Sequence, residues 1–234
     1  MYEINDMPEP VDPELLDLLA QCRTESIGHH RHWGFAHGAI KAVMPERRVV
    51  GTAVTVAVPG HDSGMVSHLF GMLRPGDFIC IDRLGDDHNA CWGGGTTLAA
   101  KVGGAAGVVI DGPSTGSSKW REYDLPGWIR GYSPITCHPY GIGGAINVPV
   151  SIGGAAVLPG YAVLADESGV LFLPPDDVRY LAEMALERQA RQPSGLDRIR
   201  AGEKQGDMVG ITDKIANAVA EERARKARAG RRET

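Results

Sequence analysis

The sequence predicts a single mixed α/β domain followed by a helical carboxyl-terminal arm. Length is the first indication, because 234 residues suit one domain with an appendage at roughly 150 residues per domain. Composition is the second, since 43% hydrophobic and 23% charged residues are typical of a globular protein with a real core. The third is an alternation of strand-like and helix-like segments that begins at Val49. We expect an amino-terminal helix and a histidine-rich segment over residues 1–40, the α/β domain over 41–192 and the arm over 193–234.

The first 40 residues contain one clear helix and one segment without periodicity. Asp12 is a good N-cap and Pro13 suits the first helical position; an apolar stripe follows, formed by Leu15, Leu16, Leu18 and Leu19. Residues 24–38 then hold four histidines, two aromatic residues and three glycines with neither helical nor alternating periodicity. This composition indicates a loop or a broken helix beside a functional element.

Between residues 49 and 112 the elements follow the order expected of parallel strands joined by helices. Apolar and β-branched runs predict strands over residues 49–58, 78–82 and 106–112, and helices are expected over residues 63–73 and 96–102. A strand, a glycine-rich loop, a helix and a further strand in succession are typical of a parallel α/β connection.

The second half is richer in turns. Strands are expected over residues 128–131 and 148–152, and residues 163–173 predict a hairpin that turns around Asp166 to Gly169. Helical periodicity returns over residues 176–192, with Asp176 or Asp177 as the cap, and a last helix begins near Thr212.

Charge and cysteine usage exclude several classes of protein. The net charge is −5, and basic residues gather over residues 221–234, which leaves the body of the chain acidic. A nucleic-acid binder would show a basic face, so we expect no nucleic-acid partner and interpret the tail as a solvated helix end rather than a polyanion-binding arm. No run of about 18 apolar residues is present to span a membrane. The acidic amino terminus is unlike a signal peptide, and the four cysteines form no CxxC motif, which predicts a reduced, cytoplasmic protein.

The strongest motif is the glycine run Gly93, Gly94 and Gly95, followed by Thr96. Glycines let the backbone approach a ligand closely, and the helix after them offers free N–H groups and a positive dipole end, which suits an anion. A tight strand-to-helix turn is the alternative explanation. The run lacks the complete GxGxxG pattern and no Gly-Lys-Ser/Thr follows, so nucleotide binding is not expected.

Several segments together resemble the family of regulator of ribonuclease activity A, which includes divalent-metal 4-hydroxy-4-methyl-2-oxoglutarate and 4-carboxy-4-hydroxy-2-oxoadipate aldolases. The matching segments are residues 49–56, 75–82, 93–112, 129–134 and 147–174. The resemblance implies a β/β/α swivelling-domain-like (RraA-like) α/β fold. It also implies trimers or hexamers of this chain, with active sites in clefts between neighbouring subunits.

The resemblance also assigns roles to positions around the glycine run. Backbone amides of Gly93, Gly94, Gly95 and Thr96 would hold a substrate carboxylate. An acidic residue of that loop, and an Arg-Asp pair shortly after Asp111 and Gly112, would place the metal and neutralise the substrate. In this sequence those three positions fall on Gly94, Thr115 and Gly116. A metal and a fixed cation stabilise the enolate of such a lyase by several kcal/mol, so either the reaction is lost or other residues carry it.

Two cations and one histidine are candidates for the missing roles. Lys119 and Arg121 lie four and six residues after Thr115, close enough for either to reach the substrate carboxylate, although both could be plain surface charges. His68 lies on the helix that contributes a polar residue to the pocket in the aldolases, and it could act as general acid or base. A histidine on the helix surface, and an N-cap role for the nearby Asp62, are the alternatives.

Two stretches could hold a divalent metal. Asp87 and His88 lie in a polar loop that offers oxygen ligands and an imidazole, and His88 is also a candidate catalytic residue. His29 and His32 belong to the histidine-rich segment, whose spacing fits one helical face only loosely. We expect Mg²⁺ or Mn²⁺, with Zn²⁺ as the alternative; a solvated polar loop is the competing explanation for the first stretch.

These observations favour a carbon–carbon lyase, similar to an aldolase or decarboxylase, that acts on a small oxo- or hydroxy-carboxylate with a divalent metal. Gly93, Gly94, Gly95, Thr96 and Thr115 would bind the substrate, and His68, His88, Lys119 and Arg121 are the catalytic candidates. The alternative is a non-catalytic binding or regulatory protein of the same family. Methyl transfer is excluded, because no glycine-rich loop of the S-adenosylmethionine-binding kind follows the first strand.

Overall fold

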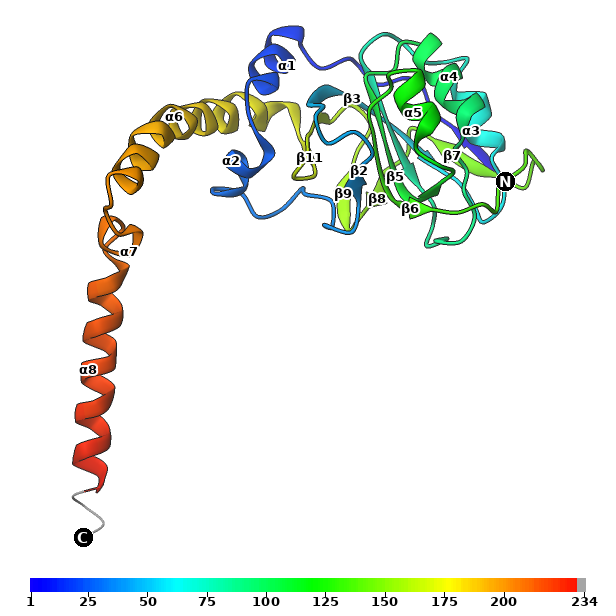
Figure 1. The fold of residues 1–234 in the computed structure, drawn as a ribbon. Coiled ribbons are helices and arrows are strands. Elements are labelled where there is room, and N and C mark those ends of the chain that lie inside the picture. The colour runs from blue at the N-terminus through cyan, green and yellow to red at the C-terminus, as the bar shows by residue number, and fades with distance from the viewer. Residues whose placement is uncertain (231–234) are drawn as a thin grey trace. The chain divides into compact units, whose positions relative to one another are not determined.

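The computed structural model describes residues 1–230 and shows two compact units, Met1–Leu186 and Glu187–Thr234. The first unit contains a nine-stranded sheet and a separate two-stranded ribbon. The fold is therefore mixed α/β with helices at the carboxyl-terminal end, as the sequence predicts (Figure 1).

Four parallel strands form the centre of the sheet: β3 (Val49–Ala57), β4 (Asp77–Asp82), β5 (Gly107–Ser114) and β6 (Gly127–Tyr132). They are neighbours in chain order, and each crossover contains a helix, namely α3 (Gly64–Leu69), α4 (Gly94–Val102) and α5 (Ser118–Glu122). These helices cover the same face of the sheet (Figure 1). The predicted parallel connection through the glycine loop is confirmed.

Short strands complete the sheet at its edges. On one side β3 pairs with β7 (Gly144–Ile146) and with β10 (Ala162–Ala165), and β7 pairs in turn with β1 (Tyr2–Ile4). On the other side β6 pairs with β2 (Lys41–Ala42). The predicted hairpin is confirmed as β10 and β11 (Val170–Leu173), and β8 (Val150–Ile152) forms the ribbon with β9 (Ala155–Val157).

Three hydrophobic clusters hold the first unit together. One lies between the parallel strands and the helices, and includes the large side chains of Trp92 and Trp120. A second lies on the opposite face, around Phe78, Trp128 and Phe172. The third packs α1 (Pro13–Ala20) and the first part of α6 (Pro175–Arg200) against the hairpin.

Local hydrogen bonds define the start of α1 and the end of α3. The Asp12 carboxylate accepts the Glu14 N–H at 2.8 Å, which confirms the predicted N-cap of α1. The histidine-rich segment begins with the short helix α2 (Thr24–Gly28) and continues as a loop. Helix α3 ends at Leu69, four residues before the predicted end, because turns at Gly71 and Met72 take over the carbonyls of His68 and Leu69.

The second unit contains the rest of α6, α7 (Gln205–Met208) and α8 (Ile211–Gly230). Helix α6 is longer than predicted and continues through Pro193. Within residues 1–230, no helix combines the length and the apolar composition that a membrane crossing requires.

Candidate functional site

The loops that follow the parallel strands meet beyond the carboxyl-terminal ends of these strands. This is the edge of the sheet at which ligands commonly bind in open α/β folds. Arg83, the first residue after β4, is fully buried and ties these loops together. Its guanidinium donates to the Asp86 carboxylate at 2.8 Å, to the Asn89 carbonyl at 3.3 Å and to the carbonyls of Val58 and Gly60. The edge is therefore organised around a buried cation.

Asp62 connects the loop after β3 to the loop before β7. Its buried carboxylate accepts the Gly64 N–H at 2.8 Å and the Ile142 N–H at 2.6 Å. Burial alone would raise the pKa of this carboxyl group, but the N–H groups of Gly64, Ile142, Gly143 and Gly141 lower it below the ordinary value. The N-cap of α3 is Ser63 and not Asp62, which was the alternative considered for Asp62. The Asp62 carboxylate instead binds the N–H of the first residue of the helix and fixes a second loop 80 residues away.

Asp86 has a structural role in the loop that precedes the glycine run. It accepts the N–H groups of His88 at 2.8 Å and Asn89 at 3.1 Å, besides its contact with Arg83. Burial would raise its pKa, but these donors and the Arg83 charge lower it. The Asp86 carboxylate is thus already occupied by its own loop.

The glycine loop, residues 93–96, forms the start of α4. The Gly93 N–H donates to the Thr96 hydroxyl at 2.8 Å, and the Thr97 N–H donates to the Gly93 carbonyl at 2.9 Å. In the described part of the chain, the N–H groups of Gly94, Gly95 and Thr96 have no acceptor. Three donors at the positive end of a helix form an arrangement that favours an anion.

Thr115 and Lys119 close over this loop. The Thr115 N–H donates to the Trp92 carbonyl at 2.9 Å, and a Cβ at Gly93 would lie 3.0 Å from the Thr115 hydroxyl oxygen. A Cβ at Gly94 would lie 2.9 Å from Cγ of Lys119, so the lysine stem covers that glycine. The hydrogen bond from the Lys119 ammonium to the Glu122 carboxylate, 2.6 Å long, raises the lysine pKa and keeps it charged.

Arg121, the second predicted cation, lies elsewhere. Its guanidinium donates to the Val43 carbonyl at 3.0 Å and lies 3.6 Å from the Glu46 carboxylate, next to β2 rather than at the glycine loop. Of the two candidates, the structure brings only Lys119 to the loop.

The remaining candidates are spread over the surface. His68 is exposed on the last turn of α3, and His29 and His32 are exposed at and after the end of α2. Asp87 and His88 are exposed in the loop after β4. There Asp87 lines a hollow of about 220 Å³ together with Asp86, Asp111 and Arg130, of which the last two form an ion pair.

The donor set at the glycine loop does not fit a divalent metal. Gly94 and Gly116, the positions to which the resemblance assigns acidic side chains, carry none, and the Lys119 stem occupies the space above Gly94. Within residues 1–230, no group of three or more His, Cys, Asp or Glu side chains is arranged to hold a metal ion. The loop itself therefore offers a cation and amide donors rather than metal ligands.

Sequence reasoning missed two residues that shape this edge. Arg83 gives no signal in the sequence, because its partners are mainly loop carbonyls. Asp111 serves in the sequence analysis only as the position from which the Arg-Asp pair is counted, yet its carboxylate accepts the Gly153 N–H at 2.7 Å and pairs with Arg130. A carboxylate within an otherwise apolar strand was the one available indication.

Comparison with known proteins identifies a family and a set of relatives. Residues 14–172 match a family described as RraA-like, Aldolase/RraA. A protein of Halalkalibacterium halodurans, provisionally named a 4-hydroxy-4-methyl-2-oxoglutarate aldolase, is 34% identical over 151 residues, 64% of this chain and 71% of that protein. The 4-hydroxy-4-methyl-2-oxoglutarate aldolase of Thermus thermophilus is 32% identical over 120 residues, 50% of this chain and 73% of that one.

A solved structure shows the same fold. Streptomyces coelicolor RraAS2, described as an unusual member of the RNase ES inhibitor RraA protein family, superimposes with a TM-score of 0.70 at 24% identity. The match covers 83% of this chain and 98% of that chain. The family match covers most of the α/β domain, and the fold is shared with RraA proteins. This chain therefore belongs to the RraA-like family.

Proposed function

We propose that this protein binds a small oxo- or hydroxy-carboxylate at the start of α4 and cleaves a carbon–carbon bond in it. The observation that carries the proposal is the set of three unpaired N–H groups at Gly94, Gly95 and Thr96, with the stem of the charged Lys119 side chain against Gly94. The names of two relatives support the substrate class, because 4-hydroxy-4-methyl-2-oxoglutarate is a hydroxy-oxo acid of this kind.

We assign substrate binding and charge stabilisation to different residues of the loop. The amides would hold the substrate carboxylate, and the Thr115 hydroxyl beside Gly93 can donate one more hydrogen bond. Lys119 would lie next to the enolate oxygen that becomes negative as the carbon–carbon bond breaks and its electron pair enters the enolate. In a hydroxy-oxo acid the hydroxyl on the cleaved carbon becomes a carbonyl and gives its proton to water, and the enolate takes a proton from water to form pyruvate. Donors aimed at a developing charge are usually the largest single contribution to such catalysis. No step is assigned to a metal, because the residues at the loop do not fit one.

The test measures pyruvate release from 4-hydroxy-4-methyl-2-oxoglutarate and carbon dioxide release from oxaloacetate by the purified protein. We expect turnover that falls at least about tenfold in Lys119→Met and is unchanged in the matched variant Arg121→Met. Absence of turnover under all conditions, or equal loss in both variants, would contradict the proposal.

The same assay decides whether the predicted Mg²⁺ or Mn²⁺ takes part. Each reaction is run in excess chelator and again after either ion is restored. Turnover that persists in chelator is expected from the donor set of the loop. Turnover that appears only with metal would mean that Asp87, His88, His29, His32 or a neighbouring subunit supplies ligands, in keeping with the trimers or hexamers that the resemblance implies.

A second candidate function is binding without catalysis, as in a regulatory protein. The observation that favours it is the absence of acidic and basic side chains at Gly94, Thr115 and Gly116. It predicts that pyruvate or oxalate binds to the protein, as measured by titration calorimetry, with no product formed in either assay.

A further inference from the structure

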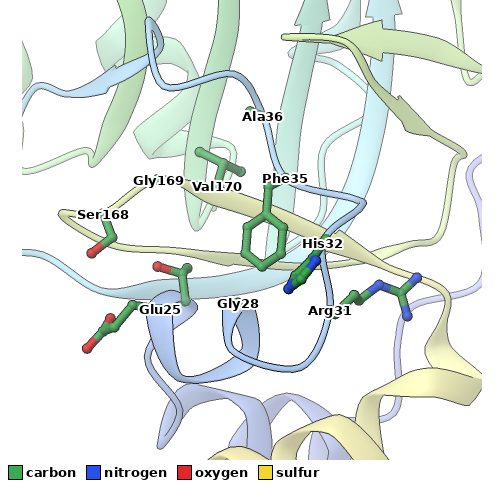
Figure 2. Close-up of a pocket in the computed structure, with 10 residues that line it drawn as sticks. Glu25, Gly28, Arg31, His32, Phe35, Ala36, Ser168, Gly169 and Val170 are labelled. Atoms are coloured by element: carbon green, nitrogen blue, oxygen red, sulfur yellow. The ribbon is translucent and has the colours of Figure 1, made fainter. Parts of the chain in front are cut away.

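The loop part of the histidine-rich segment borders two adjoining hollows, remote in sequence from the glycine loop. The smaller, about 280 Å³, lies between α2 and the turn of the β10–β11 hairpin (Figure 2). The larger, about 640 Å³, extends toward the β8–β9 turn. Arg31, His32 and Phe35 line both hollows. Their volumes are close to or within the range of about 300–1,000 Å³ typical of small-molecule sites.

The wall of these hollows is fixed by backbone hydrogen bonds. The Phe172 N–H donates to the Gly34 carbonyl at 2.8 Å, the Ala36 N–H to the Val170 carbonyl at 2.9 Å, and the His37 N–H to the Gly153 carbonyl at 2.9 Å. The segment thus continues the hairpin as an extra strand-like edge. A site built on such a support is formed before any ligand arrives.

One guanidinium and two imidazoles line the larger hollow. They belong to Arg31, His32 and His37, and no carboxylate lines it. The Arg31 side chain is only 9% exposed; its guanidinium pairs with Asp177 at 2.7 Å and donates to the Trp33 carbonyl at 3.2 Å. Figure 2 shows the His32 ring beside the Phe35 ring, with the Arg31 guanidinium directed away from Phe35. A planar guanidinium is well suited to an incoming carboxylate.

The uncharged part of the lining is aromatic. Trp33, Phe35, Tyr161 and Phe172 line the larger hollow. The Trp33 ring lies over the Arg31 guanidinium at 4.6 Å from its centroid, yet this residue is 65% exposed. A large ring held in place on one side and open on the other can stack against a second planar ring.

We propose that the larger hollow binds a small aromatic carboxylate, with its ring against Trp33 and Tyr161 and its charge facing Arg31 and His32. This ligand site is separate from the glycine loop and does not depend on the lyase proposal. The lining combines one buried guanidinium, two imidazoles and four aromatic rings, and among the described residues no carboxylate lies in it. Asp177, outside the lining, pairs with Nη1 of Arg31. The donors of the guanidinium that remain and the surrounding rings suit a planar anion better than a cation or an aliphatic ligand.

Titration calorimetry with 2-naphthoate tests the proposal, and 2-naphthol serves as the uncharged probe of matched ring size. We expect 2-naphthoate to bind with a Kd below about 1 mM, where 1 mM corresponds to about −4.1 kcal/mol, and 2-naphthol to bind at least about tenfold more weakly. No binding of 2-naphthoate, or equal affinity for the two probes, would overturn the proposal.

Variants locate the site. Trp33→Ala and His32→Gln should each raise the Kd for 2-naphthoate at least about threefold. Their matched controls, Tyr140→Ala and His30→Gln, change an exposed aromatic residue and an exposed histidine that do not line either hollow, and should leave the Kd unchanged. Equal effects in variants and controls would overturn the assignment. Carbon–carbon lyase turnover should be the same in Trp33→Ala and Tyr140→Ala, which keeps this test separate from that of the glycine loop.

Discussion

Replacing Asp62 by asparagine should destabilise the protein more than any other single-atom change at the sheet edge. The carboxylate has no solvent exposure, and its two oxygens each accept a backbone N–H, from Gly64 at 2.8 Å and from Ile142 at 2.6 Å. In Asp62→Asn an NH₂ group takes the place of one oxygen, so one buried N–H loses its acceptor and faces another donor. An unsatisfied buried group costs about 1–3 kcal/mol, and hydrogen bonds to charged groups contribute about 1.5–3 kcal/mol. We therefore expect the free energy of unfolding at pH 7 to fall by about 2–4 kcal/mol.

The pH dependence gives an independent check. Because the pKa of Asp62 is lowered in the folded protein, its contribution to stability is complete above the ordinary value of 3.8 and is lost as the pH falls through the lowered pKa. The difference between wild type and Asp62→Asn should therefore shrink in acid. Urea unfolding followed by circular dichroism at a series of pH values measures both quantities.

A matched control is Asp87→Asn, which changes an exposed carboxylate in a nearby loop and should shift stability by less than about 0.5 kcal/mol. If Asp62→Asn unfolds at the same urea concentration as wild type at pH 7, the assigned role of the buried carboxylate is wrong.

Three further predictions concern the site and the core. Thr115→Val removes the hydroxyl beside Gly93 and should weaken pyruvate binding about fivefold in titration calorimetry, since one hydrogen bond contributes about 1 kcal/mol; unchanged affinity would remove Thr115 from the site. Gly127→Ala places a Cβ in steric conflict with the Trp120 ring. It should lower the free energy of unfolding, measured by urea denaturation, by about 1–3 kcal/mol. Burial raises the pKa of Cys22 from 9.0 to about 11, so stability should be complete below pH 9 and fall above it, as the unfolded chain ionises first. Cys22→Ala should show a smaller alkaline loss than wild type.

The central strands could be predicted from the sequence because their signal is local. The runs at residues 49–57 and 107–114 are rich in β-branched and apolar residues and are buried on both faces. The two- and three-residue strands β1, β2 and β7 could not be predicted in this way. Tyr2 pairs with Gly144, and Lys41 with Ile129, so such strands exist only through partners about a hundred residues away.

The sequence predicts the type of site and its main loop, but only some of the side chains around it. Three consecutive glycines before a helix marked the loop. The choice between Lys119 and Arg121 needed the structure. At 3.6 residues per turn, side chains two residues apart point about 160° from each other, so only one of the two can face the loop. The larger hollow at Arg31 draws its lining from four separate stretches of the chain, and no single stretch contains the pattern.

The placement of the tryptophans puts an optical reporter at each candidate site. The rings of Trp92 and Trp120 stack beneath the glycine loop, with 5.6 Å between their centroids. The Trp92 indole N–H donates a hydrogen bond to the Thr97 hydroxyl at 2.9 Å, within the first turn of α4. Trp33 stands exposed at the other hollow. Emission from the stacked, dry pair should be blue-shifted and insensitive to iodide, whereas emission from Trp33 should be red-shifted and readily quenched. The buried Trp128 adds to the blue-shifted emission, so in the unmodified protein the red-shifted signal of Trp33 follows its own hollow, whereas the blue-shifted signal combines the stacked pair with Trp128.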